Sequence, residues 1–466
     1  MSTENQYSSP YEFYGRIPLK QAIPLGIQHV LTMFVGNLTP LIILCGVCGL
    51  SDSNPDLVVA LLQNAMLVAG LVTLVQLYSI GPIGGKVPII MGTSSSFLAI
   101  SQAIAAQMGG GLAGFGALLG ASMVGGTTEA ILGFFIRPLR SLFPSIVTGT
   151  VVLTIGISLI PIGVTSFAGG HGSPDFGSFE NLFIAFSVMI TIIFLTHFGK
   201  GLLSSSSVLV GIIFGYILCT LMALVSPTTG VAADGTEFIR SWVINWDAIR
   251  QAGWVSVPRI MPVPLVFNMK AIGPMLLMFI ITAVETMGDT AGCIEGGMKR
   301  NATDRELSGA VICDGFGSAF AAIFGVLPNT SFSQNVGLVT MTGIVNRFAF
   351  TMGCLFLILC GLCPKLSAVL SIMPPCVLGG AAILMFSSIA LSGIALITKD
   401  GITPRTITIV SAALGLGLGM SSVAGSAAGL GSFFSLLFNG SGIFPAAVTA
   451  IALNLILPKD NEINQA

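Results

Sequence analysis

Two acidic side chains, Glu285 and Asp289, lie in a long apolar stretch over residues 268–292. They are four residues apart, so on a helix they share one face. Two like charges this close in a medium of low dielectric favour proton binding by one of them. A carboxyl group poised in this way can accept hydrogen bonds from a ligand and can also take up a proton. The alternative is a buried pair that is satisfied by backbone or hydroxyl partners.

Two further ionisable side chains fall within apolar stretches, Asp314 in residues 307–326 and His29 in residues 22–48. A charge at the centre of a bilayer costs at least about 2.5–3.5 kcal/mol, so each such group needs a reason to be there. Asp314 fits a functional acid and a structural one equally well. His29 is interpreted as a proton relay or, preferably, as a structural residue that forms a hydrogen bond with a neighbouring helix. Glu129, near the end of another apolar stretch, is expected to face water.

Two small polar motifs interrupt apolar stretches at corresponding places in the two halves of the chain. They read Met91-Gly92-Thr93-Ser94-Ser95-Ser96-Phe97 and Pro328-Asn329-Thr330-Ser331-Phe332-Ser333-Gln334. Backbone that leaves the helix at membrane depth is tolerated only where it faces protein or a water-filled cavity. Paired interrupted spans point to a midplane substrate site, with the N-termini of the following half-helices directed at the ligand. The alternative is a pair of kinked packing helices.

The second motif ends on residues suited to a flat heterocycle. The amide of Gln334 offers both donors and an acceptor to the edge of such a ring. The ring of Phe332 could stack on its face, although a lone Phe is more often part of a core.

The composition of the chain defines the class of element that must position these residues. Of its 466 residues, 53% are hydrophobic and 8% are charged, whereas an ordinary soluble domain has about 25% charged residues. This composition excludes a soluble globule of this size. The net charge of −1 gives no indication of a nucleic-acid partner. Four of the nine cysteines form two C-x-x-C pairs, Cys45/Cys48 and Cys360/Cys363, without a nearby His or further pair for zinc. They are interpreted as small packing residues.

Apolar runs of about 20 residues predict about fourteen membrane-spanning segments, two of them short or broken. The predicted spans cover residues 22–48, 57–79, 87–106, 112–134, 138–161, 181–198, 203–225, 268–292, 307–326, 329–346, 347–362, 368–396, 404–420 and 430–457. The predicted fold is an all-α polytopic membrane protein with short β-like breaks in the third and tenth spans.

The distribution of basic residues supports an even number of spans. With both termini in the cytoplasm, the inner loops hold 13 of the 18 Lys and Arg residues, in agreement with the positive-inside rule. Four of the others lie in one long outer segment, and long loops largely escape this rule. Residues 1–20 lack the basic start and apolar core of a cleavable signal peptide and are expected to form a cytoplasmic tail.

The long outer segment divides the chain into two sets of about seven spans. An odd number of spans per half places the second half upside down relative to the first, which is the inverted-repeat design of many secondary transporters. The predicted organisation is a cytoplasmic tail over 1–20, a first repeat over 21–225, an extracytoplasmic loop over 226–267, a second repeat over 268–458 and a cytoplasmic tail over 459–466.

The tenth predicted span carries a specific signature. It reads Gln334-Asn335-Val336-Gly337-Leu338-Val339-Thr340-Met341-Thr342-Gly343 and satisfies every fixed position of the signature of the nucleobase–ascorbate transporters, the second nucleobase:cation symporter family. Three other features agree: the Gln28-His29 pair, the Gly92-Thr93-Ser94 break, and Glu285 followed by an acid four residues later. The chain therefore resembles this family over essentially its whole length.

The resemblance implies a seven-plus-seven inverted repeat in two parts. Spans 1–4 and 8–11 would form a core domain that holds the substrate, and spans 5–7 and 12–14 a gate domain. It further implies proton symport by an elevator-like movement of core against gate, in a multi-pass protein of the bacterial inner membrane. The proton would be the coupling ion, with no metal or organic cofactor. The implied partners are a purine base, the proton, membrane lipid and a second copy of the chain in a homodimer.

The resemblance also implies roles for individual residues. By position, Glu285 and Gln334 would hydrogen-bond the base, and Phe332 would stack on its face. The backbone N–H groups of Ser95 and Ser333 would contact its carbonyl groups. The residues that would organise the site or the proton path are His29, Asp289, Asp314 and Asn335, while Gly337 and Thr342 belong to the signature.

Gln at the first signature position resembles xanthine and uric acid carriers, whereas Glu there resembles uracil carriers. Gln334 therefore favours an oxidised purine, whose carbonyl and N–H groups can each pair with an amide. One departure is Ser95, where relatives often have an aromatic residue, so xanthine and urate both stay open. The alternatives are a uracil or other pyrimidine permease, an anion transporter of related fold, and a channel. An enzyme is disfavoured, because the sequence offers no nucleophile–base set, metal-ligand cluster or phosphate-binding loop.

Overall fold

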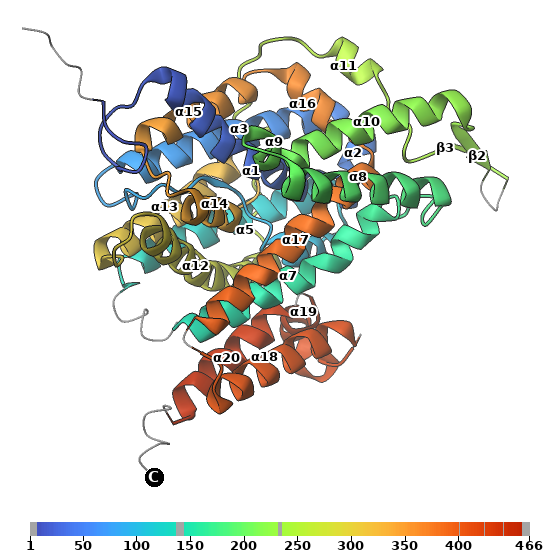
Figure 1. Cartoon of the computed structure of the whole chain (residues 1–466). Helices are drawn as coiled ribbons and strands as arrows, with labels where there is room; N and C mark the ends of the chain where they lie inside the picture. The colour runs from blue at the N-terminus through green and yellow to red at the C-terminus, as the bar shows by residue number, and fades with distance from the viewer. Residues whose placement is uncertain are drawn as a thin grey trace, which may run out of the picture.

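The computed structural model describes residues 7–136, 144–231, 235–399, 401–423, 425–440 and 442–458. This part of the chain is mostly helical (Figure 1). It also contains two antiparallel two-stranded sheets, β1–β4 and β2–β3. The first half contains α1 (Leu19–Val47), α2 (Leu50–Ser53), α3 (Pro55–Tyr78), β1 (Met91–Thr93), α4 (Leu98–Gln107), α5 (Gly111–Gly133), α7 (Ser145–Phe167), α8 (Phe179–Phe198), α9 (Leu202–Ser205) and α10 (Ser207–Val225).

The connecting segment forms β2 (Thr229–Val231), β3 (Glu237–Ile239) and α11 (Asp247–Gln251). The second half contains α12 (Met269–Gly297), α13 (Asp304–Ile323), β4 (Asn329–Ser331), α14 (Ser333–Thr342), α15 (Arg347–Gly361), α16 (Pro364–Ser371), α17 (Pro375–Thr398), α18 (Pro404–Ser422), η1 (Ala428–Leu430), α19 (Gly431–Gly440) and α20 (Ile443–Ile456). We call the face on which α1 begins the N-terminal face. The opposite face, which carries the β2–β3 hairpin and α11, is the hairpin face.

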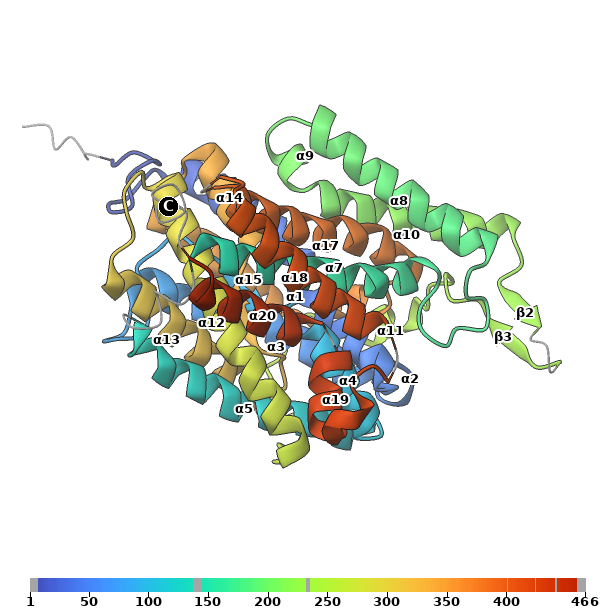
Figure 2. The ribbon, with the colours of Figure 1, turned by 90° about the horizontal axis from the view of Figure 1, so that it is seen from below.

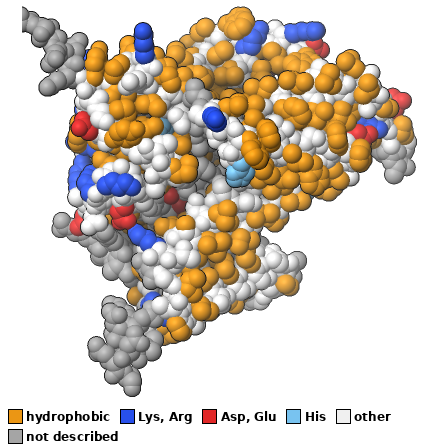
Figure 3. Space-filling view, in the orientation of Figure 1, with side chains coloured by type: hydrophobic (Ala, Val, Ile, Leu, Met, Phe, Trp, Pro, Cys, Tyr) orange, Lys and Arg blue, Asp and Glu red, His pale blue; other side chains and the backbone are white. Residues whose placement is uncertain are grey.

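Within the described residues, nine helices are long and apolar enough to cross a membrane: α1, α3, α5, α7, α8, α10, α12, α13 and α17. The other five predicted spans correspond to α4, α14, α15, α18 and α20, which are shorter, broken or less apolar. The fourteen predicted segments are therefore each represented. Large exposed apolar side chains cover α8 and α10, as Figure 3 shows, and a surface of this kind requires lipid or another apolar partner.

Three predicted boundaries are wrong. The twelfth span was expected to run unbroken over 368–396, but α16 ends at Ser371 and α17 begins at Pro375. The Pro374-Pro375 pair explains the break, because proline cannot continue a helix from the preceding turn. The last span, expected over 430–457, is divided before Gly442, whose φ of 66° lies in the left-handed region. The fifth span, expected to end at residue 161, continues as α7 to Phe167, and its expected start lies partly outside the described residues.

Helix packing shows the relation between the two halves. Helix α5 packs on α12 and α13, and α15 packs on α1 and α3. Counting predicted spans, α5 and α15 are the fourth of each half, while α1 and α12 are the first and α3 and α13 the second. Each fourth helix therefore packs on the first two helices of the opposite half. This exchange is what two intertwined inverted repeats produce.

The two polar breaks meet in one small sheet. Strands β1 and β4 pair antiparallel with Gly92 opposite Thr330. Just outside the strands, Ser94 N donates to Pro328 O at 2.8 Å and Phe332 N donates to Ile90 O at 3.1 Å. The backbone groups that leave their helices are thus paired with each other, as membrane depth requires. This pairing confirms the predicted β-like breaks.

The remaining helices pack around a second pair. Helices α7 and α17 lie along each other, with glycines at close approaches: a Cβ on Gly149 would lie 2.8 Å from Gly393 O. Helices α8 and α10 pack on each other, and α8 also packs on α17. Helices α18 and α20 pack on each other and on α7. Figure 2 shows α8 and α10 as a pair on one side of the molecule and α5, α12 and α13 on the other.

Candidate substrate site

The middle of α12 carries the two acids that the sequence placed on one helix face. Glu285 and Asp289 are 4% and 8% exposed. Ser96, in the turn before α4, donates from Oγ to Glu285 Oε2 at 2.8 Å. The hydroxyl groups of Ser331 and Ser333 donate to Asp289 Oδ2 at 2.7 and 3.0 Å. Both interrupted segments are therefore tied to α12 through serine hydroxyls.

Asp314 on α13 is held from the other side of strand β4. Its Oδ2 accepts hydrogen bonds from Thr330 Oγ1 at 3.1 Å and from the Thr286 hydroxyl. Thr330 and Ser331 are neighbours on β4, and successive side chains of a strand point to opposite faces. Strand β4 therefore lies between Asp314 and Asp289 and holds a hydroxyl toward each. Among the described residues, neither acid makes an ion pair.

His29 makes the interhelical hydrogen bond that a structural post requires. Its Nδ1 lies 2.9 Å from Asn335 Nδ2 on α14. Asn335 Oδ1 accepts from Ile90 N at 3.3 Å, so the amide group is oriented with Nδ2 toward His29. His29 Nδ1 is then the acceptor, and the neutral ring carries its proton on Nε2. Through this pair, α1 fixes α14 and the segment before β1 in one position.

The ring of Phe332 is 6% exposed and lies against the first predicted span of the chain. A Cβ on Gly36 would lie 3.0 Å from its ring. Asn37, the next residue of α1, accepts from Thr93 N at 2.7 Å. Asn37 was missed from the sequence, although a buried Asn within an apolar span, eight residues after His29, was a signal. It ties α1 to β1.

Gln334 and Ser95 are partly exposed at the two half-helices. Gln334 is the second residue of α14, whose first backbone N–H groups have no partner within the helix. Ser95 lies three residues before α4, and its carbonyl accepts from Leu98 N at 3.0 Å. Serine and threonine hydroxyls donate hydrogen bonds to the acids, whereas no described side chain forms a hydrogen bond with the amide of Gln334.

The last two signature residues lie away from this cluster. Gly337 is exposed, with open space where a Cβ would be. Thr342 Oγ1 donates to Leu338 O at 2.7 Å and accepts from Ile344 N at 3.3 Å, at the end of α14. Gly343 then closes the helix with φ of 68°. These residues shape α14 and its end, whereas the acids, the hydroxyls and Phe332 lie together.

The predicted solvent exposure of one acid outside this set is wrong. Glu129 on α5 was expected to face water, but it is 1% exposed. Helix α5 packs against both α12 and α13, so its last turns, which carry Glu129, are enclosed by helices rather than by solvent. A single acid in an apolar helix could not reveal this packing. His171 and His197, by contrast, are exposed.

Strand β1 has little room for a larger residue. A Cβ on Gly92 would lie 2.7 Å from Asn37 Oδ1, Met33 Cε and Phe332 Cε2. We expect Gly92→Ala to lower the free energy of unfolding by about 1–3 kcal/mol through overpacking, and to reduce ligand binding because Phe332 must move. Thermal unfolding with and without ligand measures both effects. Gly415→Ala on α18, where no atom lies within 4 Å, is the control; equal stability of the two variants would contradict the expectation.

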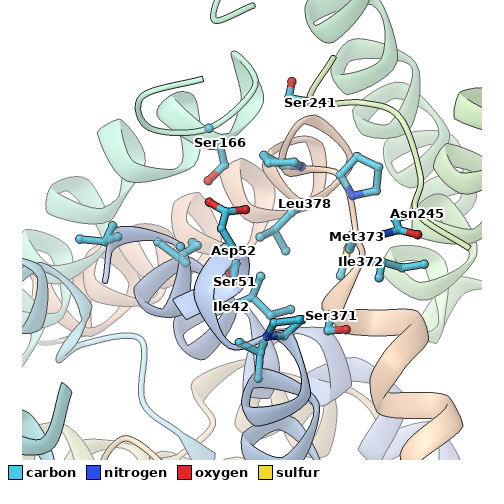
Figure 4. A pocket seen from close by; sticks show the side chains of 18 of the residues that line it. Ile42, Ser51, Asp52, Ser166, Ser241, Asn245, Ser371, Ile372, Met373 and Leu378 are labelled. Atoms are coloured by element: carbon cyan, nitrogen blue, oxygen red, sulfur yellow. The ribbon is translucent and has the colours of Figure 1, made fainter. Parts of the chain in front are cut away.

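A cavity of about 1190 Å³ opens at the hairpin face, between α1, α3 and α4 on one side and α7 and α17 on the other. Figure 4 shows Asp52 from α2 and Ser166 from α7 pointing toward each other across it. None of the polar residues around β1 and β4 lines this cavity. The enclosed polar cluster combines an aromatic face with converging donors and acceptors, so it is the candidate site, in preference to the larger cavity.

Comparison with known proteins identifies the family of the chain. The family model described as "Permease family" matches residues 20–426. The chain is 32% identical to the xanthine permease of Bacillus subtilis over 94% of its own length and 93% of that protein. It is 32% identical to the uric acid transporter UacT of Escherichia coli, covering 93% and 85% of the two chains. It is 30% identical to the xanthine permease XanP of Escherichia coli, covering 97% and 95%.

Two solved structures share the fold at low sequence identity. The transmembrane domain of the cyanobacterial bicarbonate transporter BicA matches with a TM-score of 0.55 and 14% identity, covering 93% of this chain and 98% of that one. The murine anion transporter Slc26a9, in its inward-facing state, matches with a TM-score of 0.59 and 12% identity, covering 96% and 69%. At this identity the likeness concerns the fold alone, a seven-plus-seven inverted repeat.

Proposed function

The chain belongs to the Permease family, together with xanthine and uric acid permeases, and from this premise we propose that it imports xanthine or urate by proton symport. The observation that carries the proposal is the convergence of Glu285, Asp289 and Phe332 on the paired breaks β1 and β4. Such a site offers an aromatic face and hydrogen-bonding groups to a flat polar ring. It is a transport site rather than an enzyme active site.

An oxidised purine carries both N–H donors and carbonyl acceptors around one plane. In the proposed complex, the Glu285 carboxylate accepts hydrogen bonds from ring N–H groups, and the Gln334 amide pairs with one donor and one acceptor. The backbone N–H groups of Ser95 and Ser333 bind carbonyl oxygens, and Phe332 stacks on the ring. The N-terminus of α14 favours the partial negative charge of those oxygens.

The proton is proposed to bind to the acids of α12. Glu285 and Asp289 are buried and their hydrogen-bond donors are neutral serine hydroxyls. A carboxylate in such surroundings gains by binding either a proton or a ligand with N–H groups. Because two interacting acids titrate as a pair, the proton is assigned to the pair and not to one residue. His29, Asp314 and Asn335 are proposed to hold the helices and β4 in register around them.

The N-terminal face is proposed to be cytoplasmic. Arg347 lies over the rings of Tyr14 and Tyr78, and Arg305 donates to the carbonyl oxygens of Gly81 and Pro82. These contacts place the starts of α13 and α15 and the end of α3 on the face where α1 begins. Basic residues on this face agree with the positive-inside rule. The protein is proposed to lie in the inner membrane as a homodimer with both termini in the cytoplasm.

The helices α1, α3–α5 and α12–α15 are proposed to form the core, and α7–α10 and α17–α20 the gate. Between the site and the N-terminal face the two groups touch, since a Cβ on Gly288 would lie 2.8 Å from Thr148 Cγ2. Nearer to that face, Lys399 Nζ lies 2.7 Å from Glu295 Oε2. At the hairpin face the 1190 Å³ cavity separates them. This arrangement supports an outward-facing state with an enclosed site, from which an elevator-like movement of the core would carry the base inward.

The Glu295–Lys399 pair gives a test of this state. Lys399→Glu is expected to weaken closure at the N-terminal face, since two like charges then oppose each other. The cavity would be open less often, and a Cys at position 166 would be labelled by a membrane-impermeant maleimide about two- to fivefold more slowly, the effect of a surface pair worth up to about 1 kcal/mol. The double exchange Glu295→Lys/Lys399→Glu should restore the rate.

The labelling experiment uses a Ser166→Cys chain in which Cys363, the only described cysteine that is not buried, is replaced by Ser. Lys200→Glu, an exposed charge reversal on the same face, is the control. Unchanged labelling in Lys399→Glu, or a double exchange that labels as slowly as the single variant, would rule out a role for this pair in closure.

The choice of substrate is tested by competition. Uptake of labelled xanthine is measured with xanthine, urate, uracil or hypoxanthine added in equal excess. The proposal expects xanthine or urate to compete at least about tenfold better than uracil, which corresponds to one hydrogen-bonding group left unpaired. Stronger competition by uracil would identify a pyrimidine permease of the same family instead.

A further inference from the structure

Glu129 is a buried acid that the proposed transport site does not use. It lies on α5, where this helix makes its closest approach to α13. A Cβ on Gly315 would lie 2.2 Å from Ala130 N, and one on Gly126 would lie 2.6 Å from Gly315 O. Backbones in such contact leave no room for water between the helices. Glu129, next to Ala130, and Asp314, next to Gly315, are therefore both at this dry crossing of the two helices and act on each other electrostatically.

The contacts of Glu129 are weak for a charged group. Its Oε1 is 3.5 Å from Thr282 Oγ1, and that hydroxyl also lies 3.2 Å from two carbonyl oxygens of its own helix. The single proton of a hydroxyl can serve one acceptor well. When Thr282 donates to a carbonyl group of its own helix, no described hydroxyl donates to the Glu129 carboxyl group. The geometry therefore suits a neutral carboxyl group better than a carboxylate.

Helix α12 places Glu129 and Asp314 on successive turns. Thr282, which contacts Glu129, and Thr286, which donates to Asp314, are four residues apart and share one face of the helix. Asp314 Oδ2 has its hydroxyl donors, but the buried Oδ1 has no partner among the described residues. A buried acceptor without a donor costs free energy, and a nearby carboxyl proton would satisfy it.

The charges that face Glu129 are all negative. Asp314 from α13 and Glu285 from α12 act on it electrostatically. Helix α4, which also packs on α5, contains no charged residue, and α5 has no other. No described Lys, Arg or His forms an ion pair with this group. Several buried negative charges without a cation are unstable, so at least one proton must reside here.

We propose that Glu129 and Asp314 form a proton-sharing carboxyl pair behind the substrate site, in which Glu129 carries the proton and positions Asp314. The pair acts on the site through Asp314, which accepts hydrogen bonds from Thr330 on β4 and from Thr286 on α12. Glu129 is thus a positioning residue, distinct from the acids of α12 that face the base. This proton stabilises the fold whether or not a purine is the substrate.

The test is the pH dependence of thermal unfolding of the purified protein without ligand. The pair binds its proton in the folded protein but not in the unfolded chain at neutral pH, so raising the pH removes its stabilisation. Between about pH 5.5 and about pH 8.5, Glu129→Gln should lose less stability than the parent protein, by about 2–4 °C in Tm. Asp314→Asn should show the same smaller loss of stability with pH. The loss in the double variant should equal that in either single variant.

Glu237→Gln, an exposed acid on β3, is the control and should behave as the parent. An unchanged pH dependence in Glu129→Gln would overturn the proposal. So would failure of this variant to fold, or lower stability at both pH values, since a neutral isostere can replace a protonated Glu but not an ionised one. If the double variant reduced the pH-dependent loss of Tm by the sum of the two single effects, the two acids would be independent, and this result would also refute the pair. Because no substrate is used, these results are independent of the proposed transport function.

Discussion

Glu285→Gln should weaken binding of the transported base by about 10- to 100-fold and reduce uptake accordingly. The carboxylate of Glu285 can accept hydrogen bonds from two ring N–H groups, whereas the Gln amide presents one acceptor and one donor group. Loss of a hydrogen bond to a charged group costs about 1.5–3 kcal/mol, which gives this range of affinity. Proton coupling should fall too, because Gln cannot take up the proton.

The fold should survive this change. The Gln amide is of the same shape as the carboxyl group and can still bond to Ser96, the only described hydroxyl that Glu285 contacts. Thermal unfolding without ligand separates a binding defect from misfolding, and titration calorimetry gives the affinity. Glu237→Gln is the matched control, since it makes the same chemical change at an exposed strand. Full affinity in Glu285→Gln would remove this residue from the site.

Gln334→Glu is expected to have the second-largest effect, a change of preference between bases. The amide of Gln334 has no described partner and is held at the start of α14. A carboxylate in its place offers only acceptors, so a purine carbonyl that faced the amide N–H₂ group would meet a negative charge instead. We expect xanthine or urate to bind about 10- to 100-fold more weakly, and uracil to gain relative to them.

The expected change is measured as the ratio of uracil to xanthine affinity, and not as activity alone. Gln107→Glu, on an exposed turn at the end of α4, makes the same substitution away from the site and should leave the ratio unchanged. If Gln334→Glu weakens every base equally, Gln334 supports the fold of α14 and does not select the substrate.

Local patterns predicted the parts of this site that depend on local structure. The four-residue spacing of Glu285 and Asp289 placed them on one helix face, and the polar motifs at 91–97 and 328–334 predicted where helices would break. Both follow from backbone geometry and the hydrogen-bonding demands of membrane depth. The confirmed inverted repeat follows from the number of spans in each half.

The contacts that complete the site could not be predicted in this way. Ser96 and Glu285 are separated by 189 residues, and His29 and Asn335 by 306. Such partners are brought together by helix packing, which the periodicity of one segment does not encode. The burial of Glu129 has the same origin, because the helix that covers it lies in the other half of the chain.

The break between α16 and α17 is different, because the Pro374-Pro375 pair was visible in the sequence. The span over 368–396 was predicted from hydropathy, and the residues on both sides of the pair are apolar. A proline pair ends a helix regardless of hydropathy. Length and hydropathy describe how much chain can be in a membrane, and backbone chemistry decides where a helix stops.

Proton-driven purine transport is tested most directly by uptake into proteoliposomes. Purified protein is reconstituted, an inward proton gradient is imposed, and accumulation of labelled xanthine and of labelled urate is followed with and without a protonophore. Proton symport predicts that at least one of them accumulates above its outside concentration, and that this accumulation is lost on adding the protonophore and in Glu285→Gln. Equal accumulation with and without the gradient would contradict proton symport, and no saturable uptake of either purine would contradict the proposed substrate.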